Sequence, residues 1–148
     1  MSEARFFVDT NLFVYFRDAT EVVKQKQAAE WMTYVSRQRS GRTSVQVLNE
    51  FYVTVTQKLK IKLPREEAWK DVSSLMRWNP VSIDTAIMHQ GRAIQLRYEF
   101  SWWDSLIVAS AMKARCEYLL TEDLSDGQDL DGVRVVNPFT VRPDDLIR

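Results

Sequence analysis

The stretch Phe6-Phe7-Val8-Asp9-Thr10-Asn11 decides the fold of this chain of 148 residues. An apolar run of high strand propensity leads into a polar hinge, and residues 12–16 then resume an apolar pattern. This order predicts a strand, a turn and a helix. Ligands of open α/β sheets bind at the carboxyl ends of the strands. Asp9 is therefore predicted to lie at the binding edge of a sheet.

The rest of the chain repeats this alternation. Besides residues 5–8, strands are predicted near residues 42–44 and at residues 80–83, 118–121 and 133–136. Helices are predicted over residues 28–35 and 48–59, from Pro64 onward, from the N-cap Asp84 to about residue 98, and from Ser101 to about residue 115. The alternation predicts a parallel sheet that is covered by helices on both faces.

Length and composition predict a single domain over residues 1–148, large enough to bury a core. One cysteine, Cys116, excludes an internal disulfide and fits a reducing compartment. It precedes an apolar run and is predicted to be a buried hydrophobe. The N-terminus lacks the apolar segment of a signal peptide, and no apolar stretch approaches the roughly 18 residues that span a bilayer. We therefore expect a cytoplasmic protein that does not engage a membrane.

Charge is unevenly distributed along the chain, although the formal net charge is zero. Basic residues outnumber acidic ones from residue 37 to residue 70, whereas residues 117–131 contain six acids and no lysine or arginine. This asymmetry is compatible with a basic surface for phosphates beside an acidic pocket. Two solvated faces of opposite sign would give the same pattern, so charge alone leaves the partner open.

Four acids occupy comparable positions in the predicted elements. Asp9 and Asp123 follow predicted strands, and Glu50 and Asp104 lie near the starts of predicted helices. In a parallel α/β sheet all four positions point to the same edge. Carboxylates that converge on one crevice repel each other, so this placement is expected mainly where a cation binds between them.

Three of these acids each have an alternative role that the sequence leaves open. Asp9 would also serve as a helix N-cap, and Glu50 as a solvated residue at the edge of an amphipathic helix. The stretch Ser101-Trp102-Trp103-Asp104 fits a capping box, with Asp in place of the usual Glu or Gln. Capping by Asp104 is compatible with a role in the site, because the first turn of that helix also faces the crevice.

The fourth acid, Asp123, belongs to an acidic loop over residues 122–127. Glu122 and Asp126 are alternative ligands in the same loop, and the sequence does not rank the three. A solvated acidic turn is the competing interpretation.

These residues together resemble the PIN-domain ribonucleases, and within them the VapC-type toxins of bacterial and archaeal toxin–antitoxin systems. The resemblance is carried by Val8-Asp9-Thr10-Asn11, Asn49-Glu50-Phe51, Trp103-Asp104-Ser105-Leu106-Ile107, Leu120-Thr121-Glu122-Asp123 and Gly132-Val133-Arg134-Val135-Val136-Asn137-Pro138-Phe139. It spans nearly the whole chain and rests on the order and spacing of motifs that are individually unspecific. It implies an α/β fold, a three-layer α/β/α sandwich with a mostly parallel central sheet.

The resemblance also implies a metal-dependent endoribonuclease. By position, Asp9, Glu50, Asp104 and Asp123 would be the catalytic residues and the ligands of Mg²⁺ or Mn²⁺, metals that favour carboxylates and water. Hydrogen bonds that orient these carboxylates are expected from three hydroxyl side chains that lie beside the acids in the sequence. They are Thr10, Ser105 and Thr121.

Three partners follow from the resemblance: an RNA substrate, a cognate antitoxin that blocks the cleft, and a second copy of the chain in a homodimer. The candidates for phosphate contacts are Arg37, Arg39, Arg42, Lys58, Lys60 and Lys62. Trp31, Trp102 and Trp103 are among the five tryptophans that provide aromatic surface for a core or an interface. Core packing is the prediction for most of them.

Other functional classes have less support in the sequence. A haloacid-dehalogenase-like phosphatase needs a second acid two residues after the first, where this chain has Asn11. The sole histidine, His89, lies within a predicted helix with no evident Cys or Ser partner, and no glycine-rich phosphate loop is present. The main alternative is a non-catalytic PIN-like module that binds RNA or protein, although such a module would normally have lost some of the acids.

Overall fold

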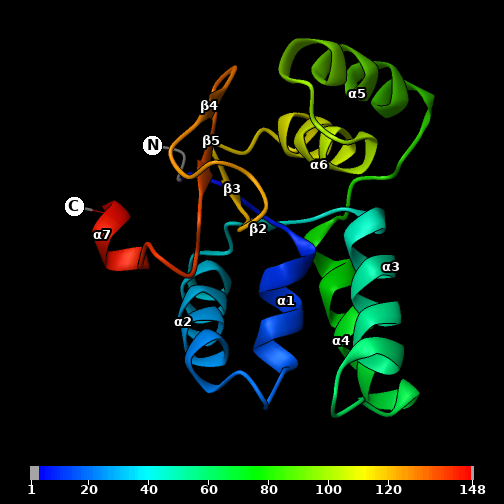
Figure 1. The fold of residues 1–148 in the computed structure, drawn as a ribbon, viewed down its shortest axis with the longest axis vertical. Helices are drawn as coiled ribbons and strands as arrows, with labels where there is room; N and C mark the ends of the chain where they lie inside the picture. The colour runs from blue at the N-terminus through cyan, green and yellow to red at the C-terminus, as the bar shows by residue number, and fades with distance from the viewer. Residues whose placement is uncertain (1–3, 148) are drawn as a thin grey trace.

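The computed structural model describes residues 4–147. Its centre is a five-stranded sheet with the strand order β2-β1-β3-β5-β4 (Figure 1). The strands are β1 (Phe6–Val8), β2 (Gly41–Arg42), β3 (Tyr118–Leu120), β4 (Asp129–Leu130) and β5 (Val133–Val136). The pairs β1–β2, β1–β3 and β3–β5 are parallel and only β4–β5 is antiparallel, so the predicted α/β fold with a mostly parallel sheet is confirmed.

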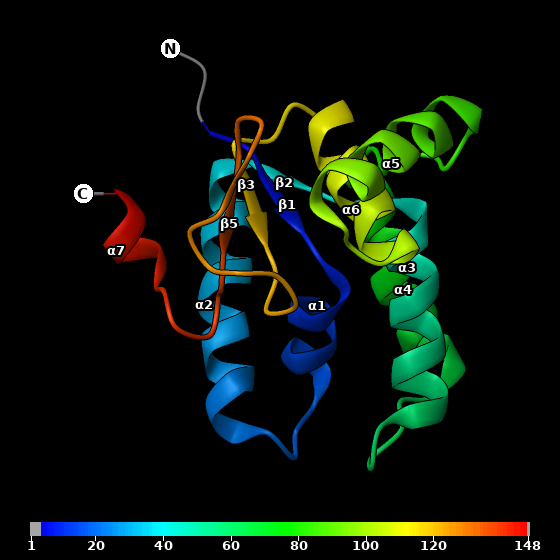
Figure 2. The ribbon, with the colours of Figure 1, turned by 45° about the horizontal axis from the view of Figure 1, so that its top comes forward.

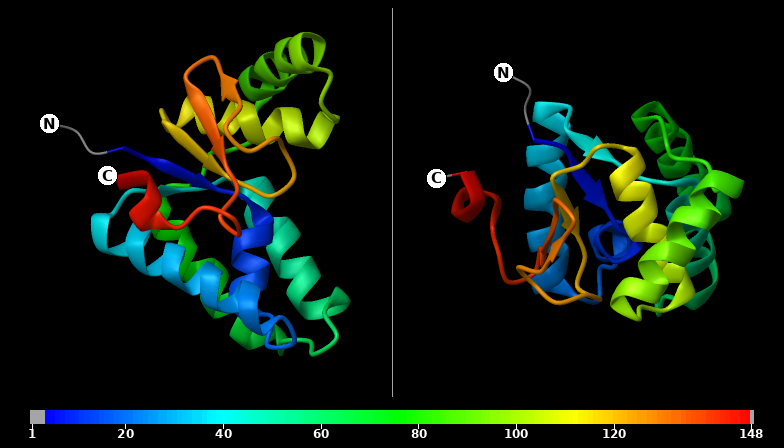
Figure 3. Two further views of the ribbon diagram at one scale, coloured as in Figure 1. Left: turned by 60° about the vertical axis from the view of Figure 1, so that its left-hand side comes forward. Right: turned by 90° about the horizontal axis from the view of Figure 1, so that it is seen from above.

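Helices cover both faces of this sheet, with α2 on one side and α6 on the other (Figure 3). The helices are α1 (Thr10–Arg17), α2 (Val22–Gln38), α3 (Val45–Val53), α4 (Arg65–Leu75), α5 (Thr85–Tyr98), α6 (Trp102–Lys113) and α7 (Pro143–Ile147). A π-helical turn, η1 (Thr54–Lys58), extends α3, and a short 3₁₀ turn, η2 (Met76–Trp78), follows α4. Each helix predicted from the sequence corresponds to one of these helical segments, and α2 extends well beyond residues 28–35 at both ends.

The prediction of a strand at residues 80–83 was wrong. Only Val81 forms a bridge there, parallel to Ser44. Pro80 has no N–H to donate, and Asp84 already caps α5 by accepting a hydrogen bond from the Ile87 backbone N–H at 2.9 Å. These two neighbours leave room for one paired residue rather than a strand.

The edge strand β4 was not predicted from the sequence. It pairs with β5 through a tight turn in which Asp131 and Gly132 both have positive φ, 52° and 100°. An Asp-Gly pair between strand-forming residues is a strong hairpin signal, because both central positions of a type I′ turn need positive φ. The signal was therefore present in the sequence.

The core lies between the sheet and its helices. All of β1 is buried, and α6 is buried on every side from Ser105 to Ala111, as expected for a helix that packs against several elements at once. Cys116 is buried as predicted, and burial raises the pKa of its thiol to about 12, which makes it inert as a nucleophile. Within residues 4–147, no helix is both long and apolar enough to span a membrane.

Trp31 anchors α2 to the segment that follows β5. Its ring is fully buried, and its indole Nε1 donates to the backbone oxygens of Pro138 at 3.1 Å and Val141 at 2.9 Å. Trp31→Phe keeps an aromatic ring but removes this donor, so we expect the free energy of unfolding to fall by about 2 kcal/mol. Urea denaturation measures the change.

The matched control is Trp69→Phe on α4, where the side chain is 53% exposed. A surface substitution of this kind should change the free energy of unfolding by less than about 0.5 kcal/mol. Equal effects of the two substitutions would show that the buried indole hydrogen bonds do not stabilise the fold.

Candidate active site at the carboxyl edge of the sheet

The register of the parallel strands places Asp9 beside Thr121. Val8 of β1 pairs with Leu120 of β3, so the next residue of each strand lies at the same edge. Thr121 Oγ1 donates to Asp9 Oδ2 at 2.8 Å, and the Thr10 backbone N–H donates to Asp9 Oδ1 at 2.7 Å. Asp9 is thus both the N-cap of α1 and a buried carboxylate, only 5% exposed.

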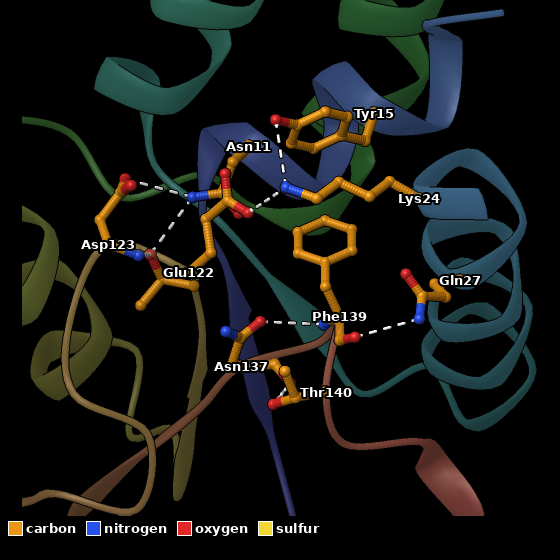
Figure 4. A network of polar contacts seen from close by, with 10 residues as sticks. Asn11, Tyr15, Lys24, Gln27, Glu122, Asp123, Asn137, Phe139 and Thr140 are labelled. Atoms are coloured by element: carbon orange, nitrogen blue, oxygen red, sulfur yellow. Dashed lines mark hydrogen bonds and ion pairs between the residues drawn. The ribbon is translucent and has the colours of Figure 1, made fainter. Parts of the chain in front are cut away.

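Asp123 reaches the same edge from the loop after β3. Its backbone N–H donates to Thr121 Oγ1 at 3.1 Å. The side-chain amide of Asn11, on α1, donates to Asp123 Oδ2 at 3.2 Å and to Thr121 Oγ1 at 3.3 Å (Figure 4). Asn11 and Thr121 therefore tie the carboxylates of Asp9 and Asp123 into one hydrogen-bonded group across two strand ends.

Glu50 and Asp104 approach this group from two helices. Glu50, on α3, accepts a hydrogen bond from Gln46 Nε2 at 2.9 Å. Asp104 lies in the first turn of α6, where its backbone N–H donates to Ser101 Oγ at 3.1 Å. This bond is the helix-capping half of the predicted capping box. Gln46 Nε2 also donates to the Trp103 carbonyl at 3.3 Å and so links the two helices.

The electrostatics of the four carboxylates show that they share one environment. Burial, with smaller contributions from Asp123 and Glu50, raises the pKa of Asp9 from 3.8 to about 7 against the effect of its two hydrogen bonds. Burial also raises the pKa of Glu50, with repulsion from Asp104 and Asp123 adding to it. Burial and repulsion from Asp123 likewise raise the pKa of Asp104. Asp9, Glu50 and Asp104 are therefore each close enough to another of the four acids for its charge to disfavour their own ionised form.

The two alternative acids of the loop make other contacts. Glu122 forms an ion pair with Lys24 at 2.9 Å, and Lys24 also contacts the hydroxyl of Tyr15 at 3.3 Å (Figure 4). Asp126 accepts a hydrogen bond from the Asn137 backbone N–H at 2.8 Å. Asp123 is the loop acid that interacts with all three of the other carboxylates.

The three hydroxyl residues expected to orient carboxylates differ in what they contact. Thr121 donates to Asp9. Ser105 donates to the Ser101 carbonyl of its own helix at 2.8 Å, and the buried hydroxyl of Thr10 has no hydrogen-bond partner among the described residues. The effect of each on a bound metal stays a prediction.

The donor set fits a hard divalent cation. All four acids offer oxygen, and Asn11 Oδ1 is buried there without a hydrogen-bond partner in the described part of the chain. Within residues 4–147, no three acidic, histidine or cysteine side chains already stand close enough to enclose an ion. Mg²⁺ commonly retains several water molecules and binds few carboxylates directly, so looser carboxylates remain compatible with such an ion.

Sequence reasoning missed two residues that position the acids. Gln46 lies one helical turn before Glu50, and side chains four residues apart on a helix meet; this spacing could have identified it. Asn11 was considered only as part of the Val8-Asp9-Thr10-Asn11 motif and as a difference from phosphatases. Its contact with Asp123 joins residues 112 positions apart, so no local pattern could have revealed it.

The basic and aromatic candidates separate into different regions. Lys58 is close enough to Glu50 to lower its pKa, and it lines a hollow with that residue. Arg39 and Arg42 instead line a pocket with Trp78, and Arg37 lines another beside α7. Of the tryptophans, Trp31 is fully buried, Trp78 and Trp102 are partly buried against the core, and Trp69 and Trp103 are exposed.

The raised pKa of Asp9 predicts a stability that falls with pH when metal is removed. The folded protein holds this proton more tightly than an unfolded chain, whose Asp has a pKa near 3.8. The stabilisation that the protonated Asp9 gives the folded state is present in full below about pH 4 and is lost as the pH rises through about 7. Asp9→Asn removes the charge. At pH 8 the free energy of unfolding of the metal-free variant should therefore exceed that of the metal-free parent by about 1 kcal/mol or more.

Thermal melts in EDTA from pH 4 to pH 8 measure this difference. With Mn²⁺ present the parent should become the more stable of the two proteins, because a cation that binds only the folded parent stabilises the parent. A difference that is independent of pH would show that Asp9 does not titrate in this range.

Comparisons with known proteins identify the family and the fold. A family model described as the PIN domain matches residues 6–125. The fold is similar to that of a toxin–antitoxin complex from Klebsiella pneumoniae, with a TM-score of 0.63 and 19% sequence identity over 91% of this chain and 98% of the other. It is also similar to that of VapC20 from Mycobacterium tuberculosis, a toxin that cleaves the sarcin–ricin loop, with a TM-score of 0.56 and 15% identity over 80% and 89% of the two chains. No curated protein sequence matches the chain.

The family match runs from the first strand to the loop that carries Asp123 and includes all four acids. The two structural neighbours extend the likeness of fold over most of the chain. The predicted family is confirmed: the chain belongs to the PIN domain family.

Proposed function

We propose that this protein is a metal-dependent endoribonuclease and the toxin of a toxin–antitoxin pair. The observation that carries the proposal is the mutual repulsion of four carboxylates at one sheet edge, because each raises the pKa of another or has its own pKa raised. Repulsion of this kind opposes folding in the absence of a cation, and a cation bound between the carboxylates offsets it. An intact set of acids argues against a non-catalytic PIN-like module.

Asp9, Glu50, Asp104 and Asp123 would hold Mg²⁺ or Mn²⁺, directly or through water. A bound ion of this kind lowers the pKa of a water and offsets charge on the phosphoryl oxygens. Other side chains of the protein position the carboxylate oxygens. Thr121 fixes one oxygen of Asp9, Asn11 fixes one of Asp123 and Gln46 fixes one of Glu50.

Lys58 is the basic residue best placed to attract RNA to this edge, because it interacts with Glu50 across a shared hollow. A lysine beside carboxylates attracts phosphate while the acids themselves repel it. Lys60 and Lys62 follow in the same segment and would extend the basic surface.

The toxin assignment draws on the structural neighbours. One belongs to a toxin–antitoxin complex and the other is a toxin that cleaves the sarcin–ricin loop. A protein antitoxin would inhibit this chain by covering the four acids, and a basic side chain would offset their charge. We also propose that the chain acts as a homodimer in the cytoplasm.

The first test is cleavage of total cellular RNA by the purified protein. We expect cuts at discrete sites with Mg²⁺ or Mn²⁺, none with EDTA, and a loss of at least about 100-fold in Asp9→Asn and Asp104→Asn. Sequencing of the new 5′ ends identifies the RNA and the position of the cut.

Cleavage that persists in EDTA or in both variants would exclude the four-acid mechanism. If nothing is cut, calorimetric titration with Mn²⁺ distinguishes the remaining cases. Uptake of the ion by the parent but not by Asp9→Asn would indicate an intact site with a narrow substrate, and no uptake would indicate a binding module.

A second test concerns the hydroxyl that holds Asp9. Thr121→Val preserves shape but removes the donor to Asp9 Oδ2, so Mn²⁺ affinity should fall about 10-fold or more, as for other groups that orient metal ligands. Ser105→Ala is the control, because its hydroxyl bonds the Ser101 backbone instead. Equal Mn²⁺ affinities in Thr121→Val and the parent would exclude the positioning role.

A further inference from the structure

A hollow beside the four acids combines an exposed aromatic ring with hydrogen-bond acceptors. It has a volume of about 570 Å³, which is within the usual size of small-molecule sites. Most of its lining residues come from α3 and the start of α6, two helices that Figure 2 shows next to each other. We call it the Trp103 pocket, and its lining residues are Val45, Gln46, Asn49, Glu50, Ile83 and Trp103.

Trp103 presents a large apolar ring at the surface. Its side chain is 63% exposed, whereas its neighbour Trp102 packs partly against the core. Exposing a large ring to water is unfavourable, and Trp103 directly precedes Asp104 in the chain. A flat apolar ring beside a candidate phosphodiester site is suited to stacking against a nucleobase.

Two side-chain amides of the pocket use their nitrogens within the protein, which leaves their oxygens to accept hydrogen bonds. Gln46 Nε2 is engaged by Glu50 and by the Trp103 carbonyl, two acceptors that fix the orientation of this amide. Its Oε1 is left buried without a partner in the described part of the chain. Asn49 likewise uses Nδ2 to donate to the Val45 carbonyl at 3.0 Å, so its Oδ1 is the group left to bind.

We propose that the Trp103 pocket binds a nucleobase that flanks the scissile phosphate, stacked on Trp103, and favours bases with an exocyclic amine. Cytosine, adenine and guanine carry such a donor and uracil does not. The inference rests on the proposed function, because the RNA must bring a phosphate to the four acids. Its occupant is a base rather than a purely apolar side chain, because the lining residue Gln46 keeps a buried oxygen without a partner among the described residues and Asn49 commits only its Nδ2 to the backbone.

Fluorescence anisotropy with short, labelled single-stranded RNAs tests the stacking. Each substitution is made in an Asp9→Asn background, so that binding is measured without cleavage. Trp103→Ala should raise the Kd by about tenfold and Trp103→Phe by less, since a base still stacks on the smaller ring. Trp69→Ala, which removes another exposed tryptophan, should leave the Kd unchanged.

The amine preference is tested by changing the RNA rather than the protein. Oligocytidine should bind about threefold or more tightly than oligouridine, and oligoadenosine more tightly than the same RNA with purine riboside, which lacks the amine. Both preferences should disappear in Trp103→Ala. Equal affinities for the paired RNAs, or an unchanged Kd in Trp103→Ala, would overturn the proposal.

These outcomes separate the pocket from the nuclease. RNA binding that depends on Trp103 in a protein that never cuts RNA would support the pocket and reject only the proposed catalysis. Cleavage that is unaffected by Trp103→Ala would support the nuclease and reject the pocket. If Trp103→Ala abolishes antitoxin binding but leaves RNA binding unchanged, the nucleobase pocket is also rejected and the surface is assigned to a protein partner.

Discussion

The hydrogen bond from Thr121 to Asp9 fixes the arrangement on which the rest of the site depends. It exists because the parallel register sets Val8 opposite Leu120, so the residues that follow both strands meet at one edge. A carboxylate so deeply buried would be costly alone. Two hydrogen bonds offset part of that cost, and the remaining part raises the pKa of Asp9 to about 7.

The main features of the site could be predicted because they depend on strand ends and helix starts. The run before Asp9 and the run before Asp123 are short and apolar, and parallel strands bring their carboxyl ends together whatever their order in the sheet. Asp104 was identified by its position at a helix start, where the structure places it. Glu50 was also predicted near a helix start, but α3 begins at Val45, so Glu50 lies more than one turn into that helix. The repulsion of these two acids in the folded chain agrees with the predicted convergence.

What the sequence could not predict depends on long-range register and on single side-chain contacts. Asn11 reaches Asp123 because β1 and β3 pair in parallel, with Val8 opposite Leu120, and this proximity follows from strand pairing rather than from local sequence. The ion pair between Glu122 and Lys24 of α2 joins residues 98 positions apart, so no local pattern could have predicted it. The missed β4 hairpin is different, since its Asp-Gly turn was a local signal.

The site consists of two parts that are joined differently. Asp9 and Asp123 belong to one network through Thr121 and Asn11, which the sheet holds in register. Glu50 and Asp104 are carried by α3 and α6, and within residues 4–147 one hydrogen bond, from Gln46 to the Trp103 carbonyl, joins these two helices.

Repulsion between the carboxylates weakens the site in the absence of a cation, and a divalent cation between them would offset that repulsion. The hydrogen bond from Gln46 also borders the Trp103 pocket. Trp103 directly precedes Asp104 in the first turn of α6, so a cation held by Asp104 and a base stacked on Trp103 would meet on the same turn. Metal and RNA would then favour each other's binding, because the cation offsets the repulsion between the acids and the RNA phosphate.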